Sequence, residues 1–325
     1  MERKIKVLLF SLMIVLMLSA CELPFEASEI NSETVSEEVF SETVSVSFSD
    51  EEINNTSNSA LESMEESENE ITQNQVTKPQ ILHFIDAWGE WHDTEILEDI
   101  EKNPYDVELF TGEGLDKFYE DDDYTVRLGI DVSKFQGSIN WQKVKDAGIE
   151  FVFIRIGYRG YGYGDLAEDV RFRENIKGAN EVGIDTGVYI FAQSISEEEA
   201  IEEAEYILSL IEGYEVNMPI VYDFEPIRKD VARTDDITGE QLTKNAVAFS
   251  ERIREGGCEP MIYINMPFEA FMYDLSALSD TLIWYADYEI LPQTPYRYEF
   301  WQFTNEGRVP GISGTVDLNL EFVSK

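Results

Sequence analysis

The feature that most constrains the fold is an alternation of short apolar segments and longer segments with helical periodicity, which begins at Arg127. Apolar runs typical of buried strands occupy residues 128–133, 151–157, 186–192, 219–226, 261–264, 282–285, 299–302 and 316–320. Helices are expected at about 139–147, 168–182, 196–210 and 238–256. Because strand–helix–strand crossovers produce parallel sheets, the pattern predicts an α/β fold. The alternation lapses in the last third, so we expect an irregular, TIM-like (β/α) barrel of eight strands with about five helices over residues 127–325.

The expected strand at 219–226 ends in two carboxylates, in the order Pro-Ile-Val-Tyr-Asp-Phe-Glu-Pro. Side chains alternate between the faces of a strand, so Asp223 and Glu225 point to one face and Phe224 to the other. Pro226 has no backbone N–H and ends the strand just after Glu225. The carboxyl end of the strands is the catalytic face of a parallel barrel. A pair of carboxylates at this position is typical of an enzyme that cleaves glycosidic bonds.

The composition shows why context matters for these acids. The chain has 66 acidic and 24 basic residues, so two acids separated by one residue often occur by chance, and most lie in polar, solvated runs. Asp223 and Glu225 instead follow the apolar pair Ile220 and Val221, where an unpaired carboxylate is costly. The net charge of −42 argues against a nucleic-acid partner, because nucleic-acid binding depends on Lys and Arg.

The first 20 residues are typical of a targeting segment. A basic start precedes an apolar core at 7–18 that is too short to span a membrane comfortably. Leu18-Ser-Ala-Cys21 resembles a bacterial lipobox, which predicts cleavage before Cys21 and lipidation of its thiol; an ordinary secretory signal cut at Ala20 or an uncleaved anchor is the alternative. We therefore expect a lipoprotein that is held through Cys21 on the outer face of the bacterial cell membrane.

Two segments separate Cys21 from the expected barrel. Residues 21–77 contain no Lys, Arg or His and are rich in Ser, Glu, Asn and Thr, which predicts a disordered acidic tether. Residues 78–126 are rich in aromatic side chains, among them Trp88, Trp91 and Tyr105. We interpret this second segment as an ordered pre-segment packed on the barrel, because aromatic side chains at this density usually pack on other residues. A separate carbohydrate-binding module is the alternative.

The few cysteines and histidines exclude several kinds of site. Cys258 is the only cysteine besides Cys21, so neither an intramolecular disulfide nor a zinc cluster is expected. His83 and His92 both precede the expected barrel, which argues against a catalytic triad that depends on histidine. No glycine-rich nucleotide fingerprint occurs, so we expect no cofactor. We also expect no metal, and we expect the protein to be a monomer.

Several motifs in the expected barrel resemble those of one known family. They are Gly129-Ile-Asp-Val-Ser-Lys-Phe-Gln-Gly137, Phe151–Gly157 with Tyr158-Arg-Gly-Tyr-Gly162, Gly187-Val-Tyr189, Val221-Tyr-Asp-Phe-Glu-Pro226, Ile262-Tyr-Ile-Asn265, Trp301-Gln302 and Val309-Pro-Gly-Ile-Ser-Gly-Thr-Val-Asp-Leu-Asn319. In this order they resemble glycoside hydrolase family 25, the lysozymes or N-acetylmuramidases, which have an irregular barrel of this kind. The resemblance covers about 127–323 and implies cleavage of the β-1,4 bond between N-acetylmuramic acid and N-acetylglucosamine in peptidoglycan.

The resemblance also implies roles for four acids. Glu225 matches the general acid that protonates the leaving oxygen and later activates water, and a neighbouring carboxylate can keep it protonated near neutrality. Asp223 matches either the nucleophile or the group that stabilises a sugar attacked by its own 2-acetamido oxygen, and we favour the second role. Asp131 and Asp317 match acids that shape the site, although Asp131 could instead cap a loop and Asp317 could be a turn residue.

Side chains near the strand ends are candidates for substrate binding. They are Tyr158, Tyr189, Tyr263, Trp284, Trp301 and Gln302, and core packing is the alternative for each aromatic residue. Members of the family often carry His where this chain has Ile190, which puts one substrate contact in doubt. Arg155 lies within an apolar strand, where we expect it to pair with a carboxylate.

Three functions compete. The first is a lipid-anchored muramidase, the second another retaining glycosidase such as a chitinase-like enzyme, and the third a non-catalytic lipoprotein that binds peptidoglycan. Against the third, all four of the matching acids are present.

Overall fold

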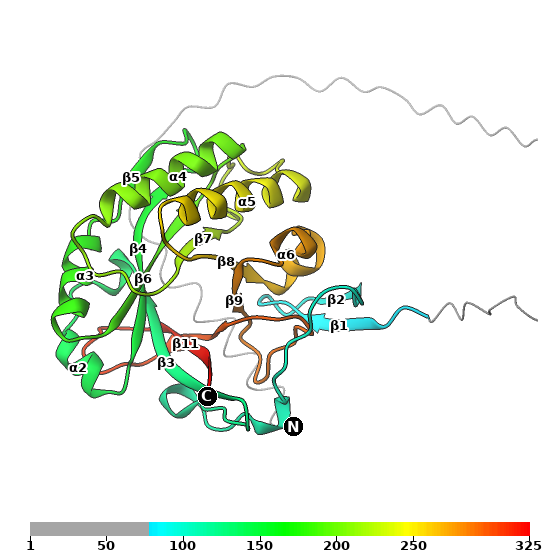
Figure 1. The fold of residues 1–325 in the computed structure, drawn as a ribbon, viewed down its shortest axis with the longest axis horizontal. Helices are drawn as coiled ribbons and strands as arrows, with labels where there is room; N and C mark the ends of the chain where they lie inside the picture. Colours follow the sequence, from blue (N-terminus) through cyan, green and yellow to red (C-terminus); the bar gives the residue numbers. More distant parts are fainter. Residues whose placement is uncertain (1–77) are drawn as a thin grey trace, which may run out of the picture. The chain divides into compact units, whose positions relative to one another are not determined.

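The computed structural model describes residues 78–325, in which eight strands close into a barrel (Figure 1). Their order around the barrel is β3-β11-β10-β9-β8-β7-β6-β4, and β3 pairs with β4 to close it. The barrel strands are β3 (Tyr124–Val132), β4 (Phe151–Arg159), β6 (Asp185–Ala192), β7 (Ile220–Phe224), β8 (Pro260–Asn265), β9 (Leu282–Ala286), β10 (Phe300–Gly307) and β11 (Val316–Ser324). The predicted irregular (β/α) barrel is thus confirmed.

Five α-helices accompany the barrel strands. They are α2 (Trp141–Asp146), α3 (Phe172–Glu181), α4 (Glu197–Leu210), α5 (Gly239–Glu255) and α6 (Met266–Phe271). The first four lie where the sequence predicts helices, and α4 and α5 run side by side along one flank of the barrel (Figure 1). Side chains cap their amino ends: the Ser196 hydroxyl accepts from the backbone N–H of Glu199, and the Thr238 hydroxyl accepts from that of Gln241. Short 3-10 helices occur at η1 (Val107–Leu109), η2 (Gly114–Asp116), η3 (Lys134–Gln136) and η4 (Leu275–Leu278).

The orientation of β11 explains why the alternation lapses near the end of the sequence. Strands β3, β4, β6, β7, β8, β9 and β10 follow one another in parallel, whereas β11 runs antiparallel to both of its neighbours, β10 and β3. A hairpin connection from β10 to β11 needs no crossover helix. The carboxyl ends of the parallel strands therefore meet the amino end of β11 at one rim of the barrel.

The apolar core has two layers, one inside the barrel and one between the barrel and the helices. The inner layer is small and aromatic, and it contains Phe151, Phe153, Tyr189, Val221, Met261, Tyr263, Trp284, Ala286 and Phe300. Glycines on neighbouring strands leave room for its rings, because a Cβ at Gly129 would lie 2.3 Å from the Phe151 ring and one at Gly187 would lie 2.4 Å from the Phe153 ring. The inner layer ends in polar residues at the rim, which places the site there.

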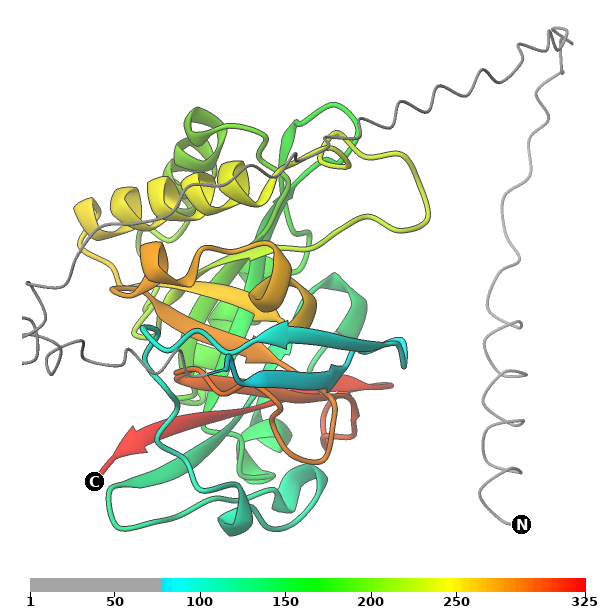
Figure 2. The ribbon, with the colours of Figure 1, turned by 90° about the vertical axis from the view of Figure 1, so that its right-hand side faces the viewer.

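Residues 78–126 lie against the barrel and contribute to its outer core. A two-stranded hairpin, β1 (Ile81–Ile85) and β2 (Trp91–Glu95), precedes an irregular segment (Figure 2). The backbone of Ile85 exchanges two hydrogen bonds with the side chain of Gln293. Further along, the Tyr105 ring stacks on Phe322 of β11 with 3.9 Å between ring centroids, and its hydroxyl donates to the carbonyl of Tyr298. This segment thus buries apolar surface that the barrel would otherwise expose.

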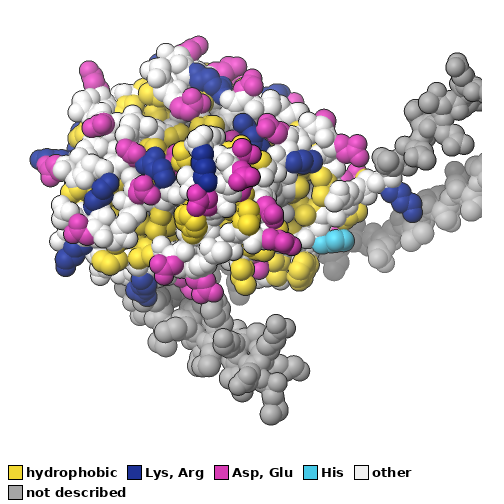
Figure 3. All heavy atoms as spheres, turned by 60° about the horizontal axis from the view of Figure 1, so that its bottom comes forward, with side chains coloured by type: hydrophobic (Ala, Val, Ile, Leu, Met, Phe, Trp, Pro, Cys, Tyr) yellow, Lys and Arg dark blue, Asp and Glu magenta, His cyan; other side chains and the backbone are white. Residues whose placement is uncertain are grey.

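The short strand β5 (Leu166–Glu168) extends the sheet beyond β4 as an antiparallel edge. On the face drawn in Figure 3, acidic and basic side chains are interspersed with small apolar areas. Within residues 78–325, no helix has the length and hydropathy needed to cross a membrane. The targeting segment 1–20, Cys21 and the tether 21–77 lie outside the described residues, so the predictions made for them stay predictions.

Candidate active site

The four matching acids line one cavity of about 280 Å³ at the rim of the barrel. Asp131 lies at the end of β3, Asp223 near the end of β7, Glu225 directly after β7, and Asp317 at the start of β11. All four occupy inward-facing positions of their strands, because residues two apart share a face. The structure therefore brings together the acids that the sequence places on three separate segments.

Asp131 is held from two sides by amide groups. Its Oδ2 accepts from Gln302 Nε2 at 2.8 Å and from Asn319 Nδ2 at 2.9 Å. Asp131 is also the direct partner of Asp317 in the antiparallel ladder between β3 and β11. This arrangement fixes the position of Asp131 in the cavity, which the alternative of a loop cap would not require.

Burial and mutual repulsion raise the pKa of these acids. Burial raises the pKa of Asp131 to about 6, against the hydrogen bonds of Asn319 and Gln302, which lower it. The pKa of Asp317 is raised to about 8, first by burial and then by the negative charge of Asp131. A single proton on one of the two carboxyl groups relieves this repulsion, because two neighbouring buried carboxyl groups cannot both ionise without a large penalty.

Asp223 and Glu225 form the second pair. Burial, followed by the charge of Glu225, raises the pKa of Asp223 well above its ordinary value, while the positive charge of Arg155 lowers it. Burial and then the charge of Asp131 raise the pKa of Glu225 to about 7. Within the described residues, Asp223 Oδ1 is buried and has no hydrogen-bond partner. The pair can hold a proton at neutral pH and can offer an open acceptor to a substrate.

The backbone beside Glu225 is anchored by a residue that the sequence did not reveal. Gln193, directly after β6, donates from Nε2 to the Glu225 carbonyl oxygen at 2.8 Å. Its Oε1 accepts from the hydroxyl of Thr234, which lies in the loop that follows Glu225. Gln193 is fully buried and links β6 to both ends of this loop. No motif could have identified it, because its role depends on the spatial neighbourhood of β6 and β7.

Of the predicted substrate-binding residues, Tyr189, Tyr263, Trp284 and Gln302 line the cavity. Trp284 is 2% exposed and forms part of the floor, where its indole N–H donates to Asn319 Oδ1 at 2.8 Å. Gln302 uses its amide N–H on Asp131, and its Oε1 accepts from the hydroxyls of Tyr263 and Tyr288. Gln302 therefore positions an acid, and its amide is already occupied. Tyr288, which also lines the cavity, comes from a loop and was not predicted.

The prediction that Trp301 binds substrate is wrong. Trp301 is fully buried on the outer side of β10, where its ring packs edge-on against Phe110 of the pre-segment. Its indole N–H donates to the carbonyl oxygen of Asp287. The physical reason is strand alternation: Gln302 points into the barrel, so its neighbour Trp301 points out of it.

Tyr158 lies in an adjoining groove of about 620 Å³, beyond β4. The groove and the acid cavity share three lining residues, Phe135, Arg155 and Phe191. Phe135 is 74% exposed and belongs to the loop after β3. Arg155 pairs with the fully buried Asp169, as expected for a cation in an apolar strand. The two hollows thus adjoin, with acids in one and mostly aromatic side chains in the other.

A model of the glycosyl hydrolases family 25 matches residues 130–312, more than half of the chain. The chain belongs to glycosyl hydrolase family 25. The predicted family is thus confirmed, and with it the enzyme class of a glycoside hydrolase.

Two curated relatives carry lysozyme names. An autolytic lysozyme of Clostridium acetobutylicum is 27% identical over 192 residues, which cover 59% of this chain and 54% of the relative. Lysozyme M1 of Streptomyces globisporus is 30% identical over 201 residues, which cover 59% of this chain and 66% of the relative. This chain thus spans less than two thirds of the length of either relative.

Solved structures agree with the barrel. The spore cortex lytic enzyme SleM of Clostridium perfringens is 25% identical, with a TM-score of 0.52, covering 60% of this chain and 67% of that one. A family 25 glycosyl hydrolase of Bacillus anthracis is 23% identical, with a TM-score of 0.52, covering 65% of this chain and 94% of that one, and supports the fold alone.

The departure from the family pattern at Ile190 has a structural explanation. Ile190 is fully buried in the outer core, between β6 and the helices, and Phe191 is the neighbour that faces the cavity. A substrate contact from position 190 is therefore not lost in this family 25 chain, because the side chain there points away from the cavity.

One group of residues outside the cavity has the composition of a cation site. Asp86, Glu90 and His92 at the end of the β1–β2 hairpin place ligand atoms within 4.8 Å of one another. The Asp86 carboxylate already accepts from the backbone N–H groups of Trp88 and Glu90 and pairs with His92. These bonds account for the cluster as a turn, so no metal chemistry is assigned to it.

Proposed function

We propose that this protein is a muramidase that cleaves the β-1,4 bond between N-acetylmuramic acid and N-acetylglucosamine in peptidoglycan. The observation that carries the proposal is the gathering of Asp131, Asp223, Glu225 and Asp317 in one rim cavity of a family 25 barrel. The names of the relatives, an autolytic lysozyme and a spore cortex lytic enzyme, support the same substrate class.

In the first step, Glu225 acts as the general acid. Its raised pKa lets it hold a proton at neutral pH, and it transfers this proton to the glycosidic oxygen as the bond to the anomeric carbon breaks. We favour attack on the anomeric carbon by the carbonyl oxygen of the sugar's own 2-acetamido group. Asp223 then accepts a hydrogen bond from the N–H of this 2-acetamido group through its Oδ1, which has no partner within the described residues. Direct attack by the Asp223 carboxylate is the alternative.

In the second step, the carboxylate of Glu225 takes a proton from water while the water oxygen attacks the anomeric carbon. The bond between that carbon and the 2-acetamido oxygen breaks, which restores the 2-acetamido group. Two displacements at one carbon retain its configuration. Asp131 and Asp317 remain unreacted, and burial together with the charge of Asp131 holds the pKa of Glu225 high enough for the first step. Tyr189 and Tyr263 on the cavity wall would contact the sugar, and Tyr158 would contact the glycan in the adjoining groove.

We also propose that the enzyme is a lipoprotein. The lipobox-like sequence before Cys21 supports attachment to the outer face of the cell membrane, and the acidic tether would let the barrel reach the wall. Cys21→Ala expressed in a bacterium that processes lipoproteins should release the protein from the membrane fraction and abolish incorporation of a labelled fatty acid. Unchanged labelling of the variant would refute lipidation at Cys21.

The decisive experiment digests purified peptidoglycan and identifies new reducing ends by mass spectrometry after reduction. The wild type should produce muramic acid ends, Glu225→Gln should produce none, and the exposed carboxylate variant Glu212→Gln should behave as the wild type. Glucosamine ends would assign a different bond, as in a chitinase-like enzyme. The absence of cleavage on several wall types would favour a non-catalytic peptidoglycan-binding lipoprotein.

A further inference from the structure

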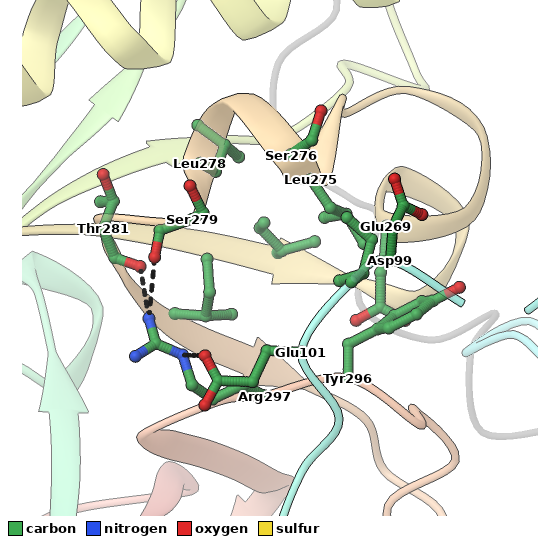
Figure 4. A pocket seen from close by; sticks show the side chains of 13 residues that line it. Asp99, Glu101, Glu269, Leu275, Ser276, Leu278, Ser279, Thr281, Tyr296 and Arg297 are labelled. Atoms are coloured by element: carbon green, nitrogen blue, oxygen red, sulfur yellow. Dashed lines mark hydrogen bonds and ion pairs between the residues drawn. The ribbon is translucent and has the colours of Figure 1, made fainter. Parts of the chain in front are cut away.

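A second cavity, of about 280 Å³, lies between the pre-segment and the barrel (Figure 4). The pre-segment contributes Asp99, Ile100 and Glu101, and the barrel side contributes residues from β8, α6, η4, β9 and the segment before β10. None of its lining residues lines the acid cavity. It is thus a separate hollow, and part of its wall lies outside the residues that match the family.

Glu269 of α6 is the unusual residue of this cavity. It is 7% exposed, and its Oε2 accepts from the hydroxyl of Thr294 at 2.8 Å. Among residues 78–325, its buried Oε1 has no hydrogen-bond partner. An unpartnered carboxylate oxygen at this depth is costly, which indicates a group that the protein alone does not supply.

The charges around Glu269 favour a cation as that group. Burial and then the negative charge of Asp287 raise the pKa of Glu269 to about 8, against the hydrogen bond from Thr294, which lowers it, and no cationic side chain contributes. Asp99 lies at the same end of the cavity (Figure 4), and Glu101 lines the opposite end. Arg297 is the one guanidinium in the wall, but it is engaged by Glu101 and Glu299.

The remaining lining selects the kind of cation. Apolar side chains form much of the wall: Ile100, Ile264, Leu275, Leu278 and Ile283, with the ring of Tyr296. They suit a chain of methylene groups and do not suit a hydrated metal ion. The ring of Tyr296 already lies 4.5 Å from an ammonium, that of Lys102, whose Nζ donates to the Leu97 carbonyl. The ammonium of Lys102 is therefore not the partner of Oε1 of Glu269.

We propose that this cavity binds a primary alkylammonium group, with the methylene chain against the apolar wall and the ammonium on Oε1 of Glu269. The proposal is independent of the muramidase reaction, because the two cavities share no residue. Two sources carry this chemistry, a free small amine and the side chain of a lysine-like residue in a peptide.

The test is isothermal titration calorimetry of the full-length protein with n-pentylamine, with Nα-acetyl-lysine amide, and with 1-pentanol as the uncharged match. Saturable binding of n-pentylamine and at least tenfold weaker binding of 1-pentanol are expected, because a hydrogen bond between charged groups at a buried site is worth roughly tenfold or more. If the lysine derivative binds more tightly than pentylamine, a peptide is the source of the alkylammonium group. If pentylamine binds more tightly, the source is a free amine.

Glu269→Gln keeps the acceptor for Thr294 and removes the charge, so it should weaken pentylamine at least tenfold, whereas Glu212→Gln should not change it. Asp99→Asn, at an exposed position, should weaken binding severalfold, and it replaces Glu269→Gln if circular dichroism shows that the latter does not fold. Absence of saturable pentylamine binding, or equal binding by the wild type and the folded charge-removing variant, would overturn the proposal. The peptidoglycan digest is a separate measurement, so either proposal can fail alone.

Discussion

Asp131 on β3 and Asp317 on β11 are direct partners across an antiparallel strand pair, so two carboxyl groups face each other at the rim of the barrel. Like charges directly opposite one another in a sheet are destabilising. The fold tolerates the pair because Gln302 and Asn319 donate to Asp131, and because Asp317 can keep its proton. The site thus stores electrostatic repulsion that depends on pH.

The first prediction concerns stability. The pKa values of Asp131, Glu225 and Asp317 are raised in the folded state to about 6, 7 and 8. The folded state therefore binds protons more tightly than the unfolded state, and stability falls as pH rises from 5 to 8. Asp317→Asn imitates the protonated acid, so at pH 8 it should be more stable than the wild type by about 1–2 kcal/mol, since one pKa unit corresponds to about 1.4 kcal/mol. Urea unfolding at both pH values measures this, and an equal difference at pH 5 and pH 8 would contradict it.

The second prediction concerns the pH dependence of activity. Glu225 must hold its proton to act as the acid, so kcat/KM should fall as pH rises through about 7. The charge of Asp131 helps to raise this pKa, so Asp131→Asn should move the alkaline limb to lower pH in addition to reducing the rate. Initial rates on peptidoglycan between pH 4 and 9 measure the alkaline limb in the wild type and in Asp131→Asn. The control Glu212→Gln should leave the alkaline limb in place. If Asp131→Asn also leaves it in place, the charge of Asp131 does not raise the pKa of Glu225.

The third prediction concerns Asn319, which is fully buried and bonds both Asp131 and the indole N–H of Trp284. Asn319→Ala leaves two buried groups short of a partner and should cost about 2–4 kcal/mol of unfolding free energy together with much of kcat. Asn319→Asp keeps the acceptor for Trp284 but adds a carboxylate to the pair that Asp131 and Asp317 already form. Both deficits should grow between pH 5 and pH 8, because the Asn319 amide favours the ionised form of Asp131, and the deficit of Asn319→Asp should grow more steeply because this variant also adds a negative charge. Parallel pH dependences would show that Asn319 acts through shape alone.

The fourth prediction tests whether the pre-segment is integral to the fold. Tyr105 stacks on Phe322 and donates to the Tyr298 carbonyl. Tyr105→Ala should reduce the free energy of unfolding by about 3–5 kcal/mol, and Tyr105→Phe, which keeps the ring, by about 1 kcal/mol. Chemical denaturation followed by tryptophan fluorescence measures both. Similar small losses in the two variants would mean that residues 78–126 pack only loosely on the barrel.

The sequence allowed most of the barrel to be predicted because its strands are short apolar runs with helices between them. Local patterns of this kind cannot give the direction of a strand, so the antiparallel orientation of β11 became known only from the structure. The edge strand β5 was missed because its three residues, Leu166–Glu168, form no apolar run. The helix α6 was missed because it begins at Met266, directly after the last residue of β8, so no loop separates the two elements in the sequence.

The site was predictable to the extent that its residues follow strands. The parity of inward and outward positions places Asp223 and Glu225 on one face, and the same rule applied to β10 would have separated Gln302 from Trp301. Gln193 and Tyr288 could not be found in this way, because their positions depend on loops and on neighbours distant in sequence. The contact of Arg228 with Trp88, which links the loop after Glu225 to the β1–β2 hairpin, is of the same kind.

The position of β11 between β10 and β3 has a consequence for folding. It is the last barrel strand in the chain, and its partner β3 is the first, so the barrel cannot close until almost the whole of its sequence is available for folding. Until then Asp317 and Asn319 are absent from the rim, and two strand edges remain open. The four acids of the rim would thus come together only when the barrel closes, and the chain would have no complete candidate active site before that point.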